Sequence, residues 1–266
     1  MSEFSKIQWT HATFNPWRGC ARVSPGCEHC YAETWAKRNP AQLGVWGVDG
    51  TRVIASEAMW GEPLKWDRKA AAAGTRYRVF CASLADVAED RLDLIAPRER
   101  LCDVIRSTPH LDWLLLTKRI ENMTRLFPVD VLVRSWVGVT TEDQIRLDAR
   151  VPILYATPAK IRFISAEPML EGLDLAKHRP GANQLWVIIG GESGGQARPC
   201  AMGWVHSLVR QCQEADVSVF VKQLGSHPLA GTCGARLHMR HSKGGDMAEW
   251  PEDLRVRQFP EVPAHA

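Results

Sequence analysis

The sequence lacks the long apolar segments that membrane insertion and secretion require. No run approaches about 18 uninterrupted apolar residues, so the sequence predicts no membrane-spanning helix. The first ten residues, MSEFSKIQWT, lack the apolar core of a secretory signal peptide. We therefore expect a cytoplasmic protein with reduced thiols, whose eight cysteines serve metal binding or chemistry where they cluster and packing where they do not.

The sequence also lacks a strong excess of either charge. It holds 33 Lys and Arg residues against 30 Asp and Glu residues, and the net charge of +3 does not by itself indicate a nucleic-acid or membrane partner. Hydrophobic residues make up 45% of the 266 positions, which suffices for a core that needs no metal or disulfide to fold. These totals predict one globular domain over residues 1–266.

Six short apolar runs recur from residue 76 onward. Each is rich in β-branched or aromatic residues and is apolar at successive positions, which is typical of strands buried on both faces of a parallel sheet. Amphipathic patterns lie between the runs, such as the one that places Leu208, Val209 and Cys212 on one helix face. The alternation predicts an α/β fold with a parallel sheet. The runs cover residues 76–83, 111–117, 134–140, 160–167, 184–192 and 217–223.

The composition divides the domain into four segments. We expect a cysteine-loop segment at residues 1–38 and an irregular insertion, rich in Gly and Trp, at residues 39–75. The β/α units then occupy residues 76–224, and a polar C-terminal tail occupies residues 225–266.

Polar side chains that can take part in chemistry end almost every apolar run. Loops after strands are often polar, but Glu167 and Lys222 directly adjoin apolar residues, where an unpaired charge is partly desolvated. The carboxyl ends of parallel strands open onto one face, where active sites are built. We therefore predict a cofactor- or substrate-binding site that contains Asp86, Lys118, Arg119, Glu142, Glu167, Glu192, Ser193 and Lys222.

The Gly-rich segment GGESGG, residues 190–195, follows one of these runs. Gly-rich turns after a strand can present backbone N–H groups to a phosphate, but this segment matches neither the dinucleotide-binding nor the Walker pattern. A tight turn with positive φ is the simpler interpretation.

Three cysteines, Cys20, Cys27 and Cys30, form a C-x6-C-x2-C cluster and are the predicted metal ligands. A closed zinc site needs a fourth ligand, and His29, between two of the cysteines, is too cramped to share one ion easily. An iron–sulfur cluster is the second candidate, because such clusters are bound by thiolates. A [4Fe–4S] cluster on three cysteines leaves one iron open to a substrate or cofactor.

This three-cysteine loop, placed ahead of β/α units, resembles the layout of radical S-adenosylmethionine (SAM) enzymes. The usual spacing there is C-x3-C-x2-C, and their Gly-Gly-Glu motif has a counterpart here only at residues 190–192. The whole chain resembles a narrower family, the phage-related three-Cys-motif proteins, a domain of unknown function similar to radical SAM proteins. The resemblance rests on WTHATFNPWRGC, GCEHCYAE, LLLTKR, WVGVTTEDQ, RFISAEPML, WVIIGGESGGQARP, VFVKQLG and KGGDMAEWPEDLRVRQFP.

The resemblance implies a partial or complete parallel (β/α) barrel of the TIM or radical SAM type. It implies that a [4Fe–4S] cluster on the three cysteines cleaves SAM reductively, to a radical that acts on an unknown substrate. Asn15 and Trp17, just ahead of Cys20, would shape the loop or stack near the cofactor. This chain has Ala88 where the family usually has a histidine, so a catalytic role for that position is in doubt.

A second hypothesis is a non-catalytic protein stabilised by zinc or a cluster, which binds a protein partner or nucleic acid of a phage or mobile element. The mild basic charge and the run RLHMRHSK, residues 236–243, are its support. A solvated basic surface is the commoner explanation of such a run.

Overall fold

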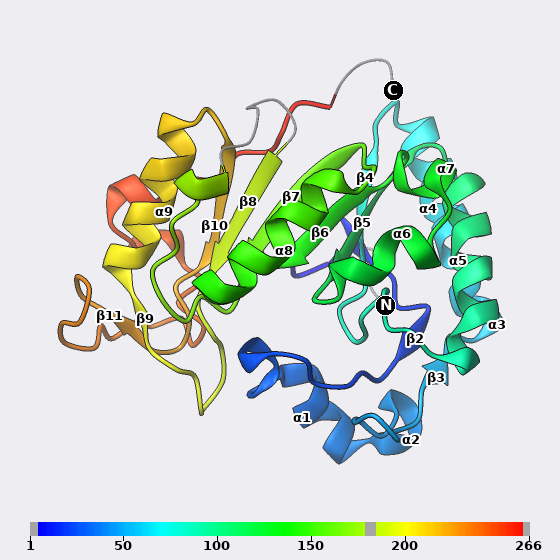
Figure 1. Ribbon diagram of the computed structural model, residues 1–266, viewed down its shortest axis with the longest axis horizontal. Coiled ribbons are helices and arrows are strands. Elements are labelled where there is room, and N and C mark those ends of the chain that lie inside the picture. The colour runs from blue at the N-terminus through cyan, green and yellow to red at the C-terminus, as the bar shows by residue number, and fades with distance from the viewer. Residues whose placement is uncertain (1–4, 179–184, 263–266) are drawn as a thin grey trace.

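Seven parallel strands form one curled sheet in the computed structural model, which describes residues 5–178 and 185–262. Each strand pairs in parallel with its neighbours in chain order. Figure 1 shows an open half-barrel with long helices along its outer side. The strands are β1 (Ala12–Thr13), β4 (Tyr77–Cys81), β5 (Leu111–Thr117), β6 (Trp136–Thr140), β7 (Ile161–Ala166), β8 (Leu185–Gly190) and β10 (Ser218–Gln223).

This architecture confirms the predicted α/β class in the form of a partial barrel. All six predicted apolar runs contain a strand, and only position 184 of those runs lies outside the described residues. The seventh strand, β1, was not predicted, because its two residues carry no readable pattern. It pairs with β4 at the edge of the sheet, and the chain passes from it to the cysteines after one further short strand.

The helices follow local sequence signals. Helix α8 begins where the side chain of Asp143 accepts a hydrogen bond from the backbone N–H of Arg146, which caps the helix. In α9 the predicted stripe, including Leu208, Val209 and Cys212, is buried. In the described part of the chain, no helix is long and apolar enough to cross a membrane. The helices are α1 (Tyr31–Arg38), α2 (Pro40–Leu43), α3 (Glu57–Trp60), α4 (Glu62–Ala72), α5 (Ile95–Arg106), α6 (Met123–Leu126), α7 (Val129–Leu132), α8 (Gln144–Ala156) and α9 (Met202–Glu214).

The insertion expected to be irregular at residues 39–75 is instead largely ordered into α2, α3 and α4. It also contributes β3 (Val53–Ile54), which pairs antiparallel with β2 (Trp17–Arg18). Trp66 and Ala70 lie four positions apart on α4, and both are buried against the outer core. The density of Gly and Trp masked this helical spacing in the sequence.

The C-terminal tail covers the open edge of the sheet. Its short strand β11 (Pro228–Leu229) pairs with β9 (Cys200–Ala201), and Gln258 N donates to Val219 O of β10 at 2.9 Å. A covered edge strand cannot pair with another chain. Positions 263–266 of the tail lie outside the described residues.

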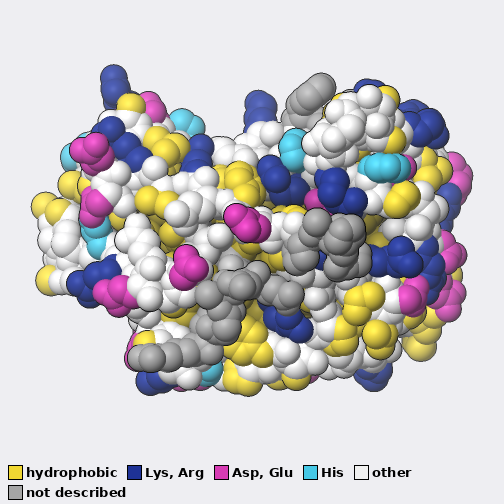
Figure 2. Space-filling model, turned by 90° about the horizontal axis from the view of Figure 1, so that it is seen from above, with side chains coloured by type: hydrophobic (Ala, Val, Ile, Leu, Met, Phe, Trp, Pro, Cys, Tyr) yellow, Lys and Arg dark blue, Asp and Glu magenta, His cyan; other side chains and the backbone are white. Residues whose placement is uncertain are grey.

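The surface does not carry charge of one sign on the face seen in Figure 2, where Lys and Arg side chains lie among Asp, Glu and apolar side chains. Within the basic run at 236–243, Arg240 forms an ion pair with Glu249, and Arg236 donates to Ser226 O.

The concave side of the sheet is filled by side chains. On β4, Phe80 points to this side, whereas Val79 and Cys81 pack under the helices. The ring of Trp186 lies edge-on to that of Trp136, with centroids 5.9 Å apart. The lumen is therefore a packed floor and not a pore. Its buried members are Trp9, Phe80, Leu114, Trp136, Ile161, Phe163, Trp186, Ile188 and Phe220.

Gly138 on β6 makes room for this packing. A Cβ there would overlap the ring of Phe163, its partner on β7, which is fully buried. We expect Gly138→Ala to destabilise the fold by about 1–3 kcal/mol, the usual cost of overpacking. Urea unfolding measures the change. Gly195→Ala is the control, because no atom lies within 4 Å of its added Cβ, and an equal loss in both variants would contradict the steric explanation.

Candidate functional site at the carboxyl ends of the strands

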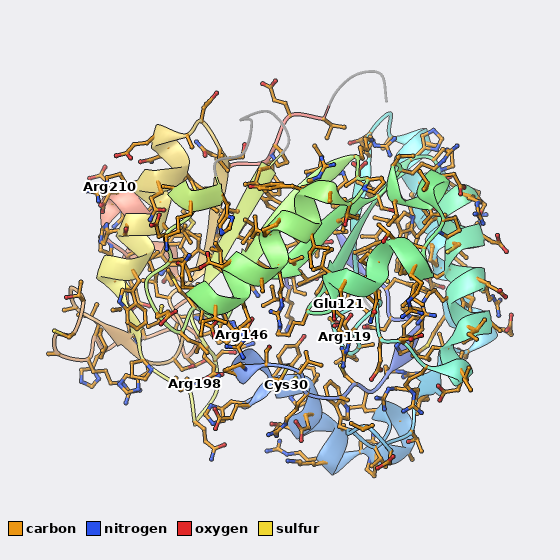
Figure 3. The ribbon with its side chains drawn as sticks, in the orientation of Figure 1. Cys30, Arg119, Glu121, Arg146, Arg198 and Arg210 are labelled. Atoms are coloured by element: carbon orange, nitrogen blue, oxygen red, sulfur yellow. The ribbon has the colours of Figure 1, made fainter. Side chains whose placement is uncertain are left out.

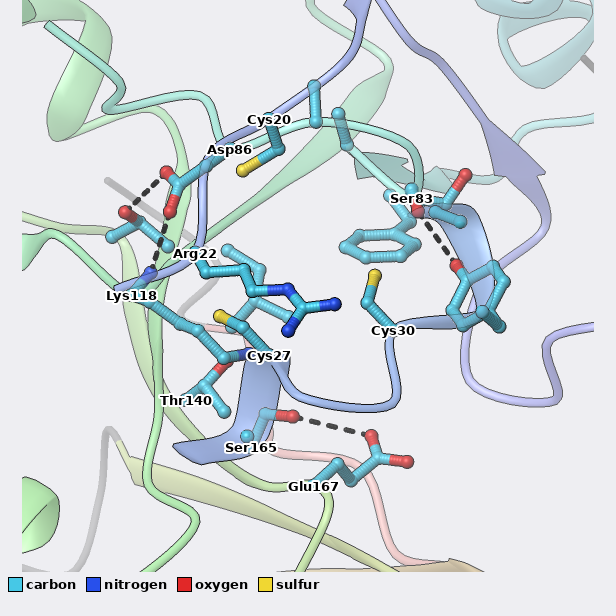
Figure 4. A pocket seen from close by; sticks show the side chains of 18 of the residues that line it. Cys20, Arg22, Cys27, Cys30, Ser83, Asp86, Lys118, Thr140, Ser165 and Glu167 are labelled. Atoms are coloured by element: carbon cyan, nitrogen blue, oxygen red, sulfur yellow. Dashed lines mark hydrogen bonds between the residues drawn. The ribbon is translucent and has the colours of Figure 1, made fainter. Parts of the chain in front are cut away.

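A pocket of about 210 Å³ opens at the carboxyl ends of the strands. Trp9, Phe80 and Leu116, which belong to or pack on the lumen cluster, form an apolar part of its lining. Figure 4 shows the thiols of Cys20, Cys27 and Cys30 around its centre. The predicted residues that line it are Cys20, Cys27, Cys30, Asp86, Lys118, Glu167 and Lys222.

The cysteine segment, residues 20–30, crosses the mouth of the half-barrel. It follows β1 and β2 and contains a 3-10 turn at Pro25–Cys27 before α1 begins at Tyr31. In Figure 1 this blue part of the chain lies along the lower edge of the sheet. Side chains that follow β5, β6 and β8 hold it there through hydrogen bonds and ion pairs.

Arg119, after β5, holds the start of the segment. Its guanidinium donates to Cys20 Sγ at 3.7 Å through Nη1 and to Ala21 O at 2.8 Å through Nη2. Burial lowers the pKa of Arg119, but Asp86, Cys20 and Glu89 together outweigh this effect and raise the pKa above its usual range. A permanent positive charge therefore lies beside the first thiol.

Asp86, after β4, is the centre of this contact. Its carboxylate accepts hydrogen bonds from Thr117 Oγ1 at 2.6 Å, from Arg119 Nη1 at 2.9 Å and from the N–H groups of Lys118 and Ala88 at 3.0 Å each. The carboxylate is buried and its acceptor positions are taken. Ala88 is fully buried, so its side chain does not reach the pocket.

Glu142, after β6, holds the middle of the segment. It is fully buried, and it accepts from the N–H of Gly26 at 3.3 Å and from Arg150 Nη1 at 2.8 Å. Burial raises the pKa of Glu142, but Lys118 and Arg150 outweigh it and lower the pKa below its usual value. A Cβ at Gly26 would lie 3.1 Å from Glu142, so glycine permits this close approach.

Glu192, after β8, holds the end of the segment. It lies 3.1 Å from His29 Nδ1 and accepts from Arg198 through three N–H groups. Glu142 and Glu192 do not line the pocket but bind the outer side of the cysteine segment. Figure 3 shows Arg119 and Arg198 on either side of Cys30.

Asn15 and Trp17 lie ahead of the cysteines but outside the pocket lining. Asn15 Oδ1 accepts from Leu84 N at 2.8 Å, so this side chain shapes the loop after β4. Trp17 is fully buried in β2. Ser193 lies partly exposed in the loop after β8 and does not line the pocket.

Charged side chains on the pocket wall are mostly paired. Lys222 of β10 donates to Glu167, after β7, at 2.7 Å. Arg22, which the sequence did not single out, enters the pocket from the cysteine segment and donates to Glu33 at 2.8 Å. Lys118 differs, because in the described part of the chain its ammonium has no hydrogen bond or ion pair.

The thiols of Cys20 and Cys30 are protonated at neutral pH in the metal-free chain. Burial raises the pKa of Cys20 to about 12, and the charge of Asp86 adds to the effect. Burial also raises the pKa of Cys30, although backbone N–H groups and Lys118 oppose it. A metal bound by these sulfurs has to displace their protons.

The three thiols line one pocket without converging on one point. Ligands of a zinc ion all lie about 2.0–2.3 Å from it. Among residues 5–178 and 185–262, no three His, Cys, Asp or Glu side chains are placed to hold a single metal ion. His29, the nearest fourth ligand in the sequence, is turned to Glu192.

Comparisons with known proteins give a family and two distant structures. A family model described as "Protein of unknown function (DUF5131)" matches residues 4–251. A search of curated proteins finds no match. Two solved structures of mutant spore photoproduct lyase are similar at 12% identity and a TM-score of 0.43, over 82% of this chain. The chain spans 57% of the length of each of those structures.

Proposed function

The chain belongs to the DUF5131 family of proteins of unknown function, and we propose its function from the chemistry of its pocket. We propose that Cys20, Cys27 and Cys30 bind a [4Fe–4S] cluster, and that the protein is a radical SAM-type enzyme. When bound, the cluster would supply the electron that cleaves SAM and starts radical chemistry on a substrate.

The arrangement of the thiols carries this proposal. Of the cysteines in the described part of the chain, three face one pocket at the mouth of a β/α half-barrel. Thiolates are the usual ligands of iron–sulfur clusters, and a cluster held by three of them keeps one iron for another ligand.

The chain's own residues would first position the thiols. Arg119 holds Cys20 and Ala21, and Glu142 holds Gly26 beside Cys27. Because Asp86 already accepts four hydrogen bonds and Glu142 does not line the pocket, we assign both to positioning and not to binding of cofactor or substrate. Asn15, between β1 and β2, and Trp17 of β2 would support the same segment.

Lys118, Glu167 and Lys222 would bind SAM or the substrate. The Lys118 ammonium, which has no hydrogen bond or ion pair among the described residues, lines the pocket and would pair with a carboxylate. The Glu167–Lys222 pair lies on the wall formed by β7 and β10, with Ser165 Oγ 3.3 Å from Glu167. This wall offers an acceptor, a donor and a hydroxyl to a polar ligand.

The aromatic floor would keep water from the reacting atoms. Trp9 and Phe80 lie 4.7 Å apart between ring centroids, and both are buried. These rings would exclude water from the side of the pocket that they line, which radical chemistry requires.

Anaerobic purification tests the proposal. We expect a brown protein with about four irons and four sulfides per chain, the content of one [4Fe–4S] cluster. The electron paramagnetic resonance spectrum of the reduced protein should change when SAM is added. A colourless protein with one zinc would overturn the proposal and favour a non-catalytic binding protein.

A further inference from the structure

The Gly-rich segment after β8 has a structural use that the proposed function does not include. The chain leaves β8 at Gly190, turns through Gly194 at φ +116°, and returns so that the N–H of Arg198 donates to Glu192 at 2.8 Å. This closed loop presents its charged side chains to the cysteine segment and not to the pocket.

Glu192 and Arg198 join the loop to two neighbouring residues of the cysteine segment. The Glu192 carboxylate lies 3.1 Å from His29 Nδ1 and accepts from Arg198 Nε at 2.9 Å and Nη2 at 2.6 Å. The same guanidinium donates through Nη1 to Glu28 at 3.0 Å. The two contacted residues lie between Cys27 and Cys30.

The environment of Glu192 favours a fixed ionic contact. The residue is only 6% exposed, and burial by itself raises its pKa. The hydrogen bonds from Arg198 outweigh burial and lower the pKa, so the carboxylate is ionised at neutral pH. Charge-assisted, multidentate hydrogen bonds of this kind hold their partners in one geometry.

We infer that Glu192 and Arg198 are positioning residues that clamp Glu28 and His29 and thereby fix the spacing of Cys27 and Cys30. Glu192 is thus not a ligand of cofactor or substrate, in contrast to the expectation from the strand-end pattern. The inference concerns the same site as the proposed function, but the clamp acts in the metal-free chain as well.

Hydrogen–deuterium exchange on the metal-free protein tests the clamp directly. In Glu192→Ala we expect the amides of residues 24–30 to exchange about tenfold faster than in the wild type. Local opening of this segment costs less free energy in the variant, because it no longer has to break the contacts of Glu192. The sheet should exchange at the wild-type rate. Arg210→Ala is the matched control, because its ion pair with Glu214 lies exposed on α9.

His29→Ala is the second variant and leaves the buried carboxylate in place. It should reproduce the faster exchange of residues 24–30 even where Glu192→Ala fails to fold. Glu192→Gln keeps an acceptor for Arg198 N and should exchange at an intermediate rate. Wild-type exchange at residues 24–30 in folded Glu192→Ala and in His29→Ala would overturn the inference.

Measurements of iron release and SAM binding distinguish a failure of the clamp from a failure of the proposed function. With reconstituted protein, Glu192→Ala should release iron to a chelator about tenfold faster, as expected for looser thiols. A variant that keeps iron and wild-type exchange but loses SAM binding would make Glu192 a ligand and overturn the clamp. A wild type without iron would end the proposed function and leave the exchange result valid.

Discussion

Cys27→Ala is expected to reduce bound iron from about four atoms per chain to nearly none after anaerobic reconstitution. Cys27 is one of three thiols on the pocket, and two thiolates cannot hold a four-iron cluster that already lacks a fourth protein ligand. His29 cannot replace the lost thiol without leaving Glu192. Iron and sulfide analysis, with the visible absorption spectrum, measures the loss.

Cys233→Ala is the control for that loss. Cys233 is exposed and lies outside the pocket, so its variant should bind iron as the wild type does. Cys27 is only partly buried, so the metal-free Cys27→Ala chain should keep the wild-type melting temperature. Full iron binding by Cys27→Ala would show that the ligand assignment is wrong.

Asp86→Ala should cause the largest loss of stability among simple changes near the site. The substitution removes a buried carboxylate that accepts four hydrogen bonds, and it leaves the Arg119 guanidinium, at 8% exposure, without its close charge partner. Glu89 lies 3.8 Å from Arg119 and compensates poorly. Breaking a buried ion pair costs about 3–5 kcal/mol.

Thermal unfolding of the metal-free protein measures this loss. For a chain of this length we expect a decrease in melting temperature of about 10 °C. Asp90→Ala removes an exposed carboxylate paired with Arg125 and should leave the melting temperature nearly unchanged. If both variants melt together near the wild type, Asp86 does not stabilise the mouth of the barrel.

The sheet was predictable from the sequence because its strands are buried on both faces. Such strands appear as continuous apolar runs, and β5 to β8 are almost entirely buried. Strand β1 could not be predicted, since two residues have no periodicity and its place depends on pairing with β4. The helices at 57–72 were missed because Gly and Trp obscured their spacing.

The sequence predicted where the candidate site lies, but not which of its side chains line the pocket and which contact the cysteine segment. The rule that strand ends meet at one face places Lys118, Glu167 and Lys222 on the pocket, as the structure shows. The same rule cannot distinguish a side chain that faces the pocket from one that holds a loop. Glu142 and Glu192 bind residues 116 and 163 positions away, and no local pattern records such contacts.

These long-range contacts set an order for the maturation of the protein during synthesis. The ribosome makes the cysteine segment well before Arg119, Glu142 and Arg198. A nascent chain that ends before residue 119 carries all three thiols without any of these contacts, and one that ends before residue 198 still lacks the contact of Arg198 with Glu28. The part of the site made first is therefore completed last, and the proposed cluster would be held firmly only after these later residues have folded against the cysteine segment.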